Sequence, residues 1–224
     1  MTPEFLVRIA TIAGITFVIP VVVALYCRVR SAPLKIIAAY TSIAFAQSLY
    51  LVWLASHGIH NLWLMHLFIP VQAGMFLWAL ALWQTREIAR TAVLLTIPLY
   101  LAAWIVLTLT VESFSTFPRF VKIFEGLLVI AVASYTLVTR SQHISGPITS
   151  YPWFWVGAAL VIYLSFGAIV NPVSSLLLPY APERVLIMSG VNSVLLMVCN
   201  VCFARAMVTA SARLRAGGVP AAAT

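Results

Sequence analysis

The chain has 224 residues, of which 63% are hydrophobic and 8% are charged, whereas soluble domains carry about 25% charged residues. Its mean hydropathy is +1.06, and this composition excludes a water-soluble fold. The net charge of +8 does not indicate a nucleic-acid partner, because the basic residues lie singly or in small groups at the ends of apolar runs. Lysine and arginine occur in this way where they anchor membrane helices.

Seven apolar segments follow one another along the chain, and each is long enough to cross a lipid bilayer. A hydrocarbon core about 30 Å thick needs roughly 20 mostly apolar residues in a helix. The segments are continuously apolar, so they do not fit the alternating strands of a membrane barrel. The sequence therefore predicts an all-α, polytopic integral membrane protein with seven transmembrane helices. The expected spans are about 4–27, 35–56, 61–84, 88–110, 118–139, 152–178 and 184–208.

The sequence indicates a single domain whose first apolar run is a membrane span. The first residues carry no basic group and no cleavage site follows the first apolar run, so we expect this run to be retained as a span. We predict one seven-helix transmembrane domain over residues 1–210 and a short, disordered cytoplasmic tail over 211–224. Prolines inside four spans permit kinks; they are Pro20, Pro70, Pro98 and Pro172.

The distribution of lysine and arginine predicts the orientation, because cytoplasmic loops are enriched in both. With the N-terminus outside, the cytoplasmic ends of the spans hold Arg28, Arg30, Lys35, Arg86, Arg90, Arg140, Arg205, Arg213 and Arg215. The outer ends hold Arg8, Arg119, Lys122 and Arg184. The sequence therefore predicts an outer N-terminus and a cytoplasmic C-terminus, in a cell membrane that we expect to be the bacterial inner membrane.

Polar side chains within the spans are the candidates for function, because they are costly in hydrocarbon. At a rise of 1.5 Å per residue, most of them fall in the outer half of the bilayer. We therefore predict a polar pocket that opens outward. The predicted ligand-binding residues are His66, Gln72, Glu125, Asn192, Gln47 and Asn171.

Glu125 is the most informative of these residues, and three roles remain open for it. A carboxylate in a helix bundle needs a cation or a hydrogen-bond donor, or it takes up a proton. It could pair with Lys122, three residues earlier, and simply fix the helix. It could instead bind a ligand or handle protons, or it could contact another subunit.

No metal, cofactor or disulfide is predicted. His57, His60 and His66 lie close in sequence, but they form no known metal motif and the chain contains no Asp to orient an imidazole ring. Cys199 and Cys202 have CxxC spacing without a thioredoxin-like strand pattern, so we expect them to pack as small apolar side chains.

Two known seven-helix families do not fit. Microbial rhodopsins hold retinal on a lysine of the last helix, but the only lysines here are Lys35 and Lys122, so we expect no retinal. Small sugar transporters carry a Pro-Gln pair in each repeat, whereas this chain has Pro70-Val71-Gln72 once.

Short motifs in four spans carry a different resemblance. They are Asn61 with His66-Leu67-Phe68-Ile69-Pro70-Val71-Gln72, Glu125, Pro152-Trp153-Phe154-Trp155 with Tyr163, and Asn192 with Asn200. In these motifs the chain resembles a poorly characterised group of bacterial seven-helix membrane proteins that are often encoded beside histidine kinases and response regulators. The resemblance implies a sensor or signalling accessory. An acidic residue is expected in that group where this chain has Gln72.

The leading functional hypothesis is a membrane-embedded small-molecule sensor or binding protein that signals through a separate membrane or cytoplasmic partner. A small-solute transporter and a structural or accessory subunit of a larger membrane complex remain as alternatives. An intramembrane enzyme has the least support, because apart from His66 and Glu125 the sequence offers no nucleophile and base.

Overall fold

The computed structural model describes residues 3–114, 118–177 and 180–215, and these residues form helices and short connections with no strand among them. Seven helical segments of this described part are long and apolar enough to cross a membrane. The predicted all-helical fold is therefore confirmed. The elements are α1 (Pro3–Ile15), α2 (Val18–Tyr26), α3 (Ala32–Ser56), α4 (Leu62–Leu82), α5 (Glu87–Thr110), α6 (Phe120–Ser141), η1 (Ile148–Ser150), α7 (Pro152–Leu177) and α8 (Pro182–Arg215).

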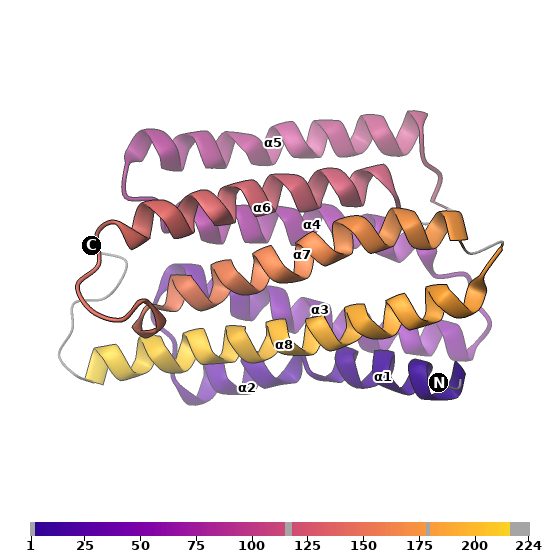
Figure 1. Ribbon diagram of the computed structural model, residues 1–224, viewed down its shortest axis with the longest axis horizontal. Coiled ribbons are helices and arrows are strands. Elements are labelled where there is room, and N and C mark those ends of the chain that lie inside the picture. The colour runs from indigo at the N-terminus through magenta and orange to yellow at the C-terminus, as the bar shows by residue number, and fades with distance from the viewer. Residues whose placement is uncertain (1–2, 115–117, 178–179, 216–224) are drawn as a thin grey trace.

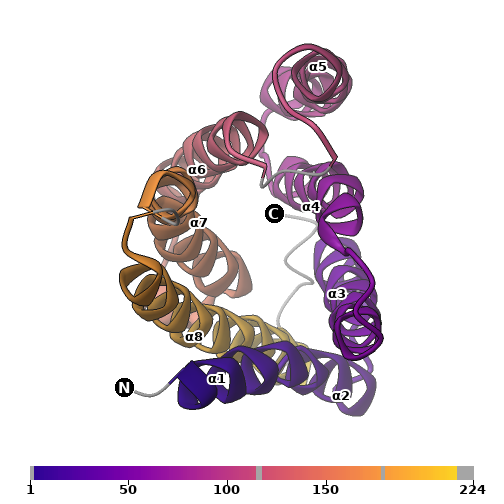
Figure 2. The same ribbon diagram turned by 90° about the vertical axis from the view of Figure 1, so that its right-hand side faces the viewer.

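The long helices run side by side along the longest axis of the molecule (Figure 1). Seen end-on, α3, α4, α6, α7, α8 and the α1–α2 pair form a ring, and α5 lies outside the ring against α4 and α6 (Figure 2). The most extensive helix contacts join α7 to α8 and α6 to α7. Large apolar side chains such as Leu25, Ile88 and Leu109 are exposed on the outside of the bundle, as lipid-facing residues are.

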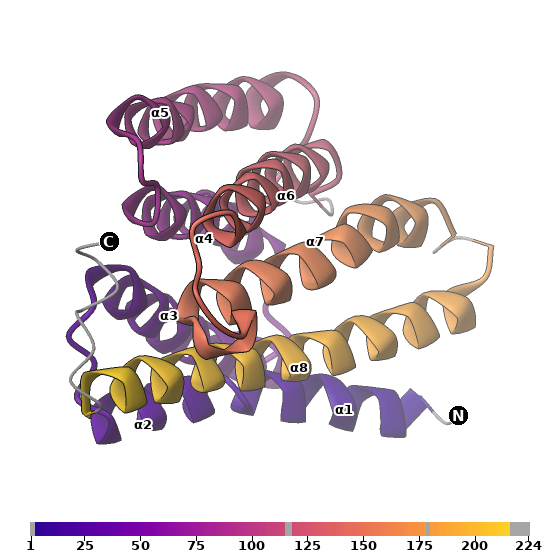
Figure 3. The same ribbon diagram turned by 60° about the vertical axis from the view of Figure 1, so that its left-hand side comes forward.

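The two ends of the bundle differ in charge. One end of the bundle holds the α2–α3, α4–α5 and α6–α7 connections and the last turn of α8, and we call it the basic end (Figures 1 and 3). We call the other end, at which α1 begins, the opposite end. Nine of the 13 basic residues lie in these connections, in the helix turns next to them or in the last three turns of α8. There α4 is tied to α6, because Arg140 Nε donates to the Trp83 carbonyl at 2.6 Å and Gln84 Nε2 donates to Thr136 Oγ1 at 2.7 Å.

The first span is broken into two helices at Thr16 and Phe17. Pro20 lacks an N–H group and its ring conflicts with the carbonyl four residues earlier. The Thr16 carbonyl instead accepts the Ile19 N–H at 3.0 Å. The Thr16 hydroxyl also accepts a hydrogen bond from Asn200 Nδ2 at 2.9 Å, which ties the break to α8. The other three predicted kink sites lie within continuous helices.

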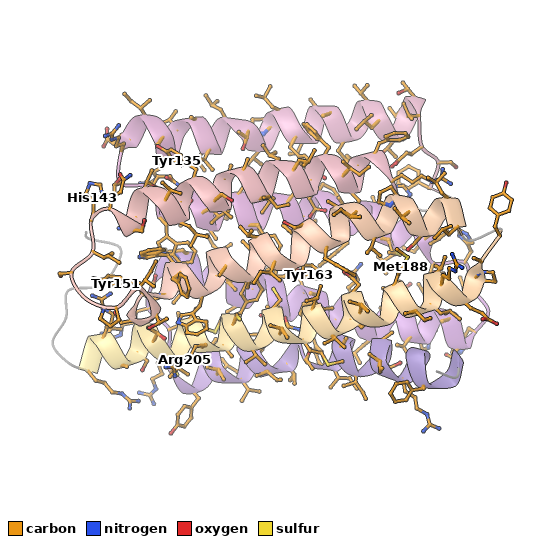
Figure 4. The ribbon with its side chains drawn as sticks, viewed as in Figure 1. Tyr135, His143, Tyr151, Tyr163, Met188 and Arg205 are labelled. Atoms are coloured by element: carbon orange, nitrogen blue, oxygen red, sulfur yellow. The ribbon has the colours of Figure 1, made fainter. Side chains whose placement is uncertain are left out.

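The last helix extends to Arg215, beyond the predicted domain boundary at 210. The guanidinium carbon of Arg213 lies 4.0 Å from the centre of the Tyr151 ring, and that of Arg205 lies 5.9 Å from the Trp155 ring. Such contacts and the favourable position of cations at a helix C-terminus stabilise these last turns. Figure 4 shows Arg205 and Tyr151 toward the basic end. The predicted tail residues 216–224 lie outside the described part of the chain.

Candidate functional site

A cavity of about 410 Å³ lies inside the ring of helices. It is bounded by α3, α4, α6, α7 and α8 and by the break between α1 and α2, and none of its lining residues comes from α5. The volume is in the range of small-molecule sites. The lining side chains are Phe17, Tyr40, Gln47, Leu51, Met65, Phe68, Ile69, Gln72, Pro118, Lys122, Tyr163, Val170, Ser174, Val185, Ser189, Asn192 and Leu196.

Aromatic side chains close the cavity toward the basic end. The Tyr40 ring lies 6.2 Å from that of Phe17 and 4.4 Å from that of Phe76, and the Phe76 ring lies 6.2 Å from that of Phe203. Phe76 and Phe203 are fully buried and belong to the apolar core. The cavity therefore occupies the middle of the bundle and the half toward the opposite end.

Three of the predicted binding residues line this cavity, namely Gln47 of α3, Gln72 of α4 and Asn192 of α8. Gln72 is buried, and its Nε2 has no hydrogen-bond partner among the described residues. The same is true of Asn192 Oδ1, and Tyr163 of α7 lines the same cavity. Figure 4 places Tyr163 about halfway along the bundle. One donor and one acceptor without partners among the described residues thus belong to side chains that line the cavity from α4 and α8.

Glu125 lies behind the cavity wall rather than in it. Its side chain is fully buried, and Oε2 lies 2.7 Å from Lys122 Nζ. The same Nζ group lies 3.4 Å from Gln72 Oε1, so Lys122 links α6 to α4. Lys122 also lines the cavity. The pairing with Lys122, one of the three roles considered for Glu125, is present in the structure. Glu125 Oε1 has no hydrogen-bond partner within the described part of the chain.

His66 does not join this group of side chains. His66 is fully buried and its ring packs edge-on against Phe114, with the centroids 5.4 Å apart. It is not among the residues that line the cavity, although its neighbour Met65 is. Asn171 belongs to α7, but its side chain lies outside the described residues. The full predicted binding set stays a prediction.

Close packing and a helix cap position the Lys122–Glu125 pair. Gly126 lets α7 approach α6, because a Cβ atom built there would lie 3.1 Å from the Ala168 Cβ. At the start of α6, Glu112 Oε1 accepts hydrogen bonds from the backbone N–H groups of Arg119 and Phe120. A carboxylate at a helix N-terminus satisfies free N–H groups and suits the helix dipole. The first turn of α6, which carries Lys122, is therefore held at a fixed place.

The predicted binding set did not include five polar residues that line the cavity: Tyr40, Lys122, Tyr163, Ser174 and Ser189. Lys122 was recognised only as a partner for Glu125, although a lysine within a span is itself a rare feature. Tyr163 was named only within the motifs that carry the family resemblance, and Tyr40 carries no signal in the sequence that separates it from other tyrosines. Ser189 lies three residues before Asn192, on the same face of α8, which is a usable signal.

The cavity lining is mostly apolar, and the charged pair beside it is balanced, because Lys122 and Glu125 compensate each other's charge. In the part of the chain that the structure describes, no group of three or more His, Cys, Asp or Glu side chains could hold a metal ion. Comparisons of this chain with protein-family models, with curated protein sequences and with solved structures found no match.

Proposed function

We propose that this chain is a membrane-embedded binding protein of the sensor type, which takes a small molecule into the central cavity and signals through a separate protein. The observation that carries the proposal is that Gln72 and Asn192 both line the cavity, and that Gln72 Nε2 and Asn192 Oδ1 are buried without a hydrogen-bond partner among the described residues. A buried polar group without a partner costs about 1–3 kcal/mol. A ligand that satisfies both atoms recovers this energy on binding.

The chemistry of the walls suggests the class of ligand. A hydroxyl or primary amide group can accept a hydrogen bond from Gln72 and donate one to Asn192. The apolar walls, with Leu51, Phe68 and Leu196 among them, suit a hydrocarbon body. An added charge would disturb the balanced Lys122–Glu125 pair. We therefore expect a neutral amphipathic molecule with a hydroxyl or amide head.

The orientation of the site rests on the positive-inside rule. The basic end, with nine of the 13 basic residues, faces the cytoplasm in this proposal, and the N-terminus lies outside. The cavity then lies in the outer half of the membrane, which we take to be the bacterial inner membrane. This arrangement presents the site to molecules that enter from outside or from the outer leaflet.

The last helix provides a route for the signal. α8 contributes Ser189 and Asn192 to the cavity and continues without a break to Arg215 at the basic end. Small shifts of one helix against its neighbours are a common way to carry a signal. In this proposal, a ligand that draws Asn192 into the cavity shifts the whole of α8, and a partner at the cytoplasmic face detects that shift.

Photolabelling tests the proposal. A medium-chain alcohol that carries a diazirine is added to the protein in lipid nanodiscs, and labelled peptides are identified by mass spectrometry. We expect saturable labelling of the α4 and α8 peptides that line the cavity, and competition by the unlabelled alcohol. Asn192→Leu should weaken this labelling, whereas the neighbouring lipid-facing change Val191→Leu should not. Labelling that never saturates and is confined to lipid-facing peptides would contradict the proposal.

A small-solute transporter is the second candidate, and the broken first span favours it. Interrupted helices often form the binding sites of transporters, and Phe17, at the break, lines the cavity. Transport would require the aromatic side chains between the cavity and the basic end to move apart. Counterflow of a neutral alcohol or amide in proteoliposomes, lost in Asn192→Leu, would support this candidate over the sensor.

A further inference from the structure

A second group of unpaired polar atoms lies on α5, the helix outside the ring. Tyr100, Trp104, Thr108 and Glu112 are spaced four residues apart, so they lie on one face of this helix and its C-terminal turn. The Tyr100 hydroxyl, Trp104 Nε1, Thr108 Oγ1 and Glu112 Oε2 are all buried and have no hydrogen-bond partner among the described residues. We call this row the α5 seam. None of its members lines the central cavity.

Thr108 shows that the seam differs from ordinary helix packing. Threonine in a helix usually donates its hydroxyl hydrogen to a carbonyl of the preceding turn. The other buried threonines of the described part, Thr41, Thr136 and Thr209, all do so. Thr108 is equally buried but makes no such bond. Its hydroxyl is therefore available to a group in the seam.

The seam extends to Glu125. Tyr100 packs in a small cluster with Val121 and Leu128 of α6 and with Ile69 of α4. Glu125 lies between Val121 and Leu128 along the same helix, and its Oε1 is another buried oxygen without a hydrogen-bond partner in the described residues. Figure 2 shows α4, α5 and α6 as three neighbours around this position. The Glu125 carboxyl therefore has Lys122 beside one oxygen, and its second oxygen has no hydrogen-bond partner among the described residues.

The ionisable groups around Glu125 come from every helix nearby. Lys122 is the paired cation on α6, and Tyr100 of α5, Tyr40 of α3 and Tyr163 of α7 interact with its charge. On α4 the ionisable side chain is His66, whose ring packs against Phe114. Lys122 is the one cation in direct contact with the carboxyl within the described part of the chain.

The seam is a candidate site for bound water. Residues four apart rise about 6 Å along a helix, so the four polar groups follow one another along α5 and its C-terminal turn. Buried polar groups without protein partners are normally satisfied by bound water. Four successive polar groups without partners among the described residues would otherwise be a large unfavourable contribution in one helix interface.

We propose that α4, α5 and α6 enclose a chain of bound water molecules, which runs along the α5 seam from Glu112 to Glu125 and carries protons between the opposite end of the bundle and the Glu125 carboxyl. The protons move along the water molecules, because the Trp104 N–H group can only donate. A proton that reaches Glu125 converts its carboxylate to the neutral acid and weakens its hold on Lys122. This inference does not depend on the ligand proposed for the central cavity.

Removing single hydroxyl groups tests whether the seam holds water. If it is dry, Thr108→Val and Tyr100→Phe remove unpaired groups and raise the thermal unfolding midpoint. If it is hydrated, both changes remove hydrogen bonds to water and lower the midpoint. Thr96→Val is the matched control on α5, because the Thr96 hydroxyl bonds to the Val93 carbonyl of its own helix. We expect Thr108→Val to fall below this control, and a midpoint equal to or above the control overturns the proposal.

Infrared spectroscopy tests the route of the proton. The band of the protonated Glu125 carboxyl is assigned as the one that disappears in Glu125→Gln, or that changes frequency in Glu125→Asp if the first variant does not fold. Transfer of the wild-type protein to D₂O shifts this band as the proton exchanges. We expect Thr108→Val to slow the exchange several-fold and Thr96→Val to leave it unchanged. The proposal is overturned if no such band occurs at any pH at which the protein is folded, or if Thr108→Val exchanges at the wild-type rate.

Discussion

Replacing Lys122 with methionine removes the cation that pairs with the buried Glu125 carboxylate and keeps most of the side-chain length. Lys122 Nζ lies 2.7 Å from Glu125 Oε2, and the exposed fractions of the two side chains are 19% and 0%. Removal of one partner of a buried ion pair costs about 3–5 kcal/mol, because the remaining charge loses its compensation. We expect Lys122→Met to lower the free energy of unfolding by about this amount.

The partner variants separate the charge from the packing. Glu125→Gln leaves Lys122 partly exposed in the cavity and still close to Gln72 Oε1, so we expect a smaller loss of about 1–3 kcal/mol. The double variant Lys122→Met with Glu125→Gln removes both charges and should recover most of the stability that Lys122→Met loses. Lys35→Met is the control, because Lys35 is exposed near the basic end.

Unfolding in detergent micelles provides the measurement. Sodium dodecyl sulfate is titrated into the purified protein in mild detergent, and tryptophan fluorescence follows the transition. A change below about 1 kcal/mol for Lys122→Met would match a solvent-exposed pair and would refute the reasoning from burial. A double variant no more stable than Lys122→Met would show that the loss comes from packing and not from an uncompensated charge.

Three further changes test the supports of the site. Gly126→Ala should lower the thermal midpoint, because the new Cβ meets a side chain of α7 at 3.1 Å, whereas Gly74→Ala, with 3.9 Å to its nearest neighbour, should be tolerated. Glu112→Ala removes the acceptor for two N–H groups at the start of α6. It should lower the free energy of unfolding by about 1–2 kcal/mol and speed the exchange of these backbone amide hydrogens. Unchanged exchange would contradict the cap. Thr136→Val removes the bond from Gln84 and should cost about 1 kcal/mol in the same unfolding titration, so a stabilised variant would argue against that bond.

The seven spans and the charge difference between the two ends of the bundle follow from the sequence alone. In hydrocarbon the backbone must satisfy its hydrogen bonds within each segment, so every span needs its own long apolar run, and such runs are visible without knowledge of the partners. The prolines show where this local reasoning ends. Pro20 coincides with a break, while Pro70 lies within a continuous helix, because the surrounding helices determine how a freed carbonyl is accommodated.

The membership of the site was decided only by the tertiary structure. Depth along a span can be counted from the sequence, and it predicted that Gln72 and Asn192 lie in the same half of the bilayer; both line the cavity. Counting did not give the rotation of each helix about its axis. Rotation turns His66 toward Phe114 and places Lys122, rather than Glu125, at the cavity wall. It is set by contacts between helices, such as the close approach at Gly126, and the sequence of one helix does not contain them.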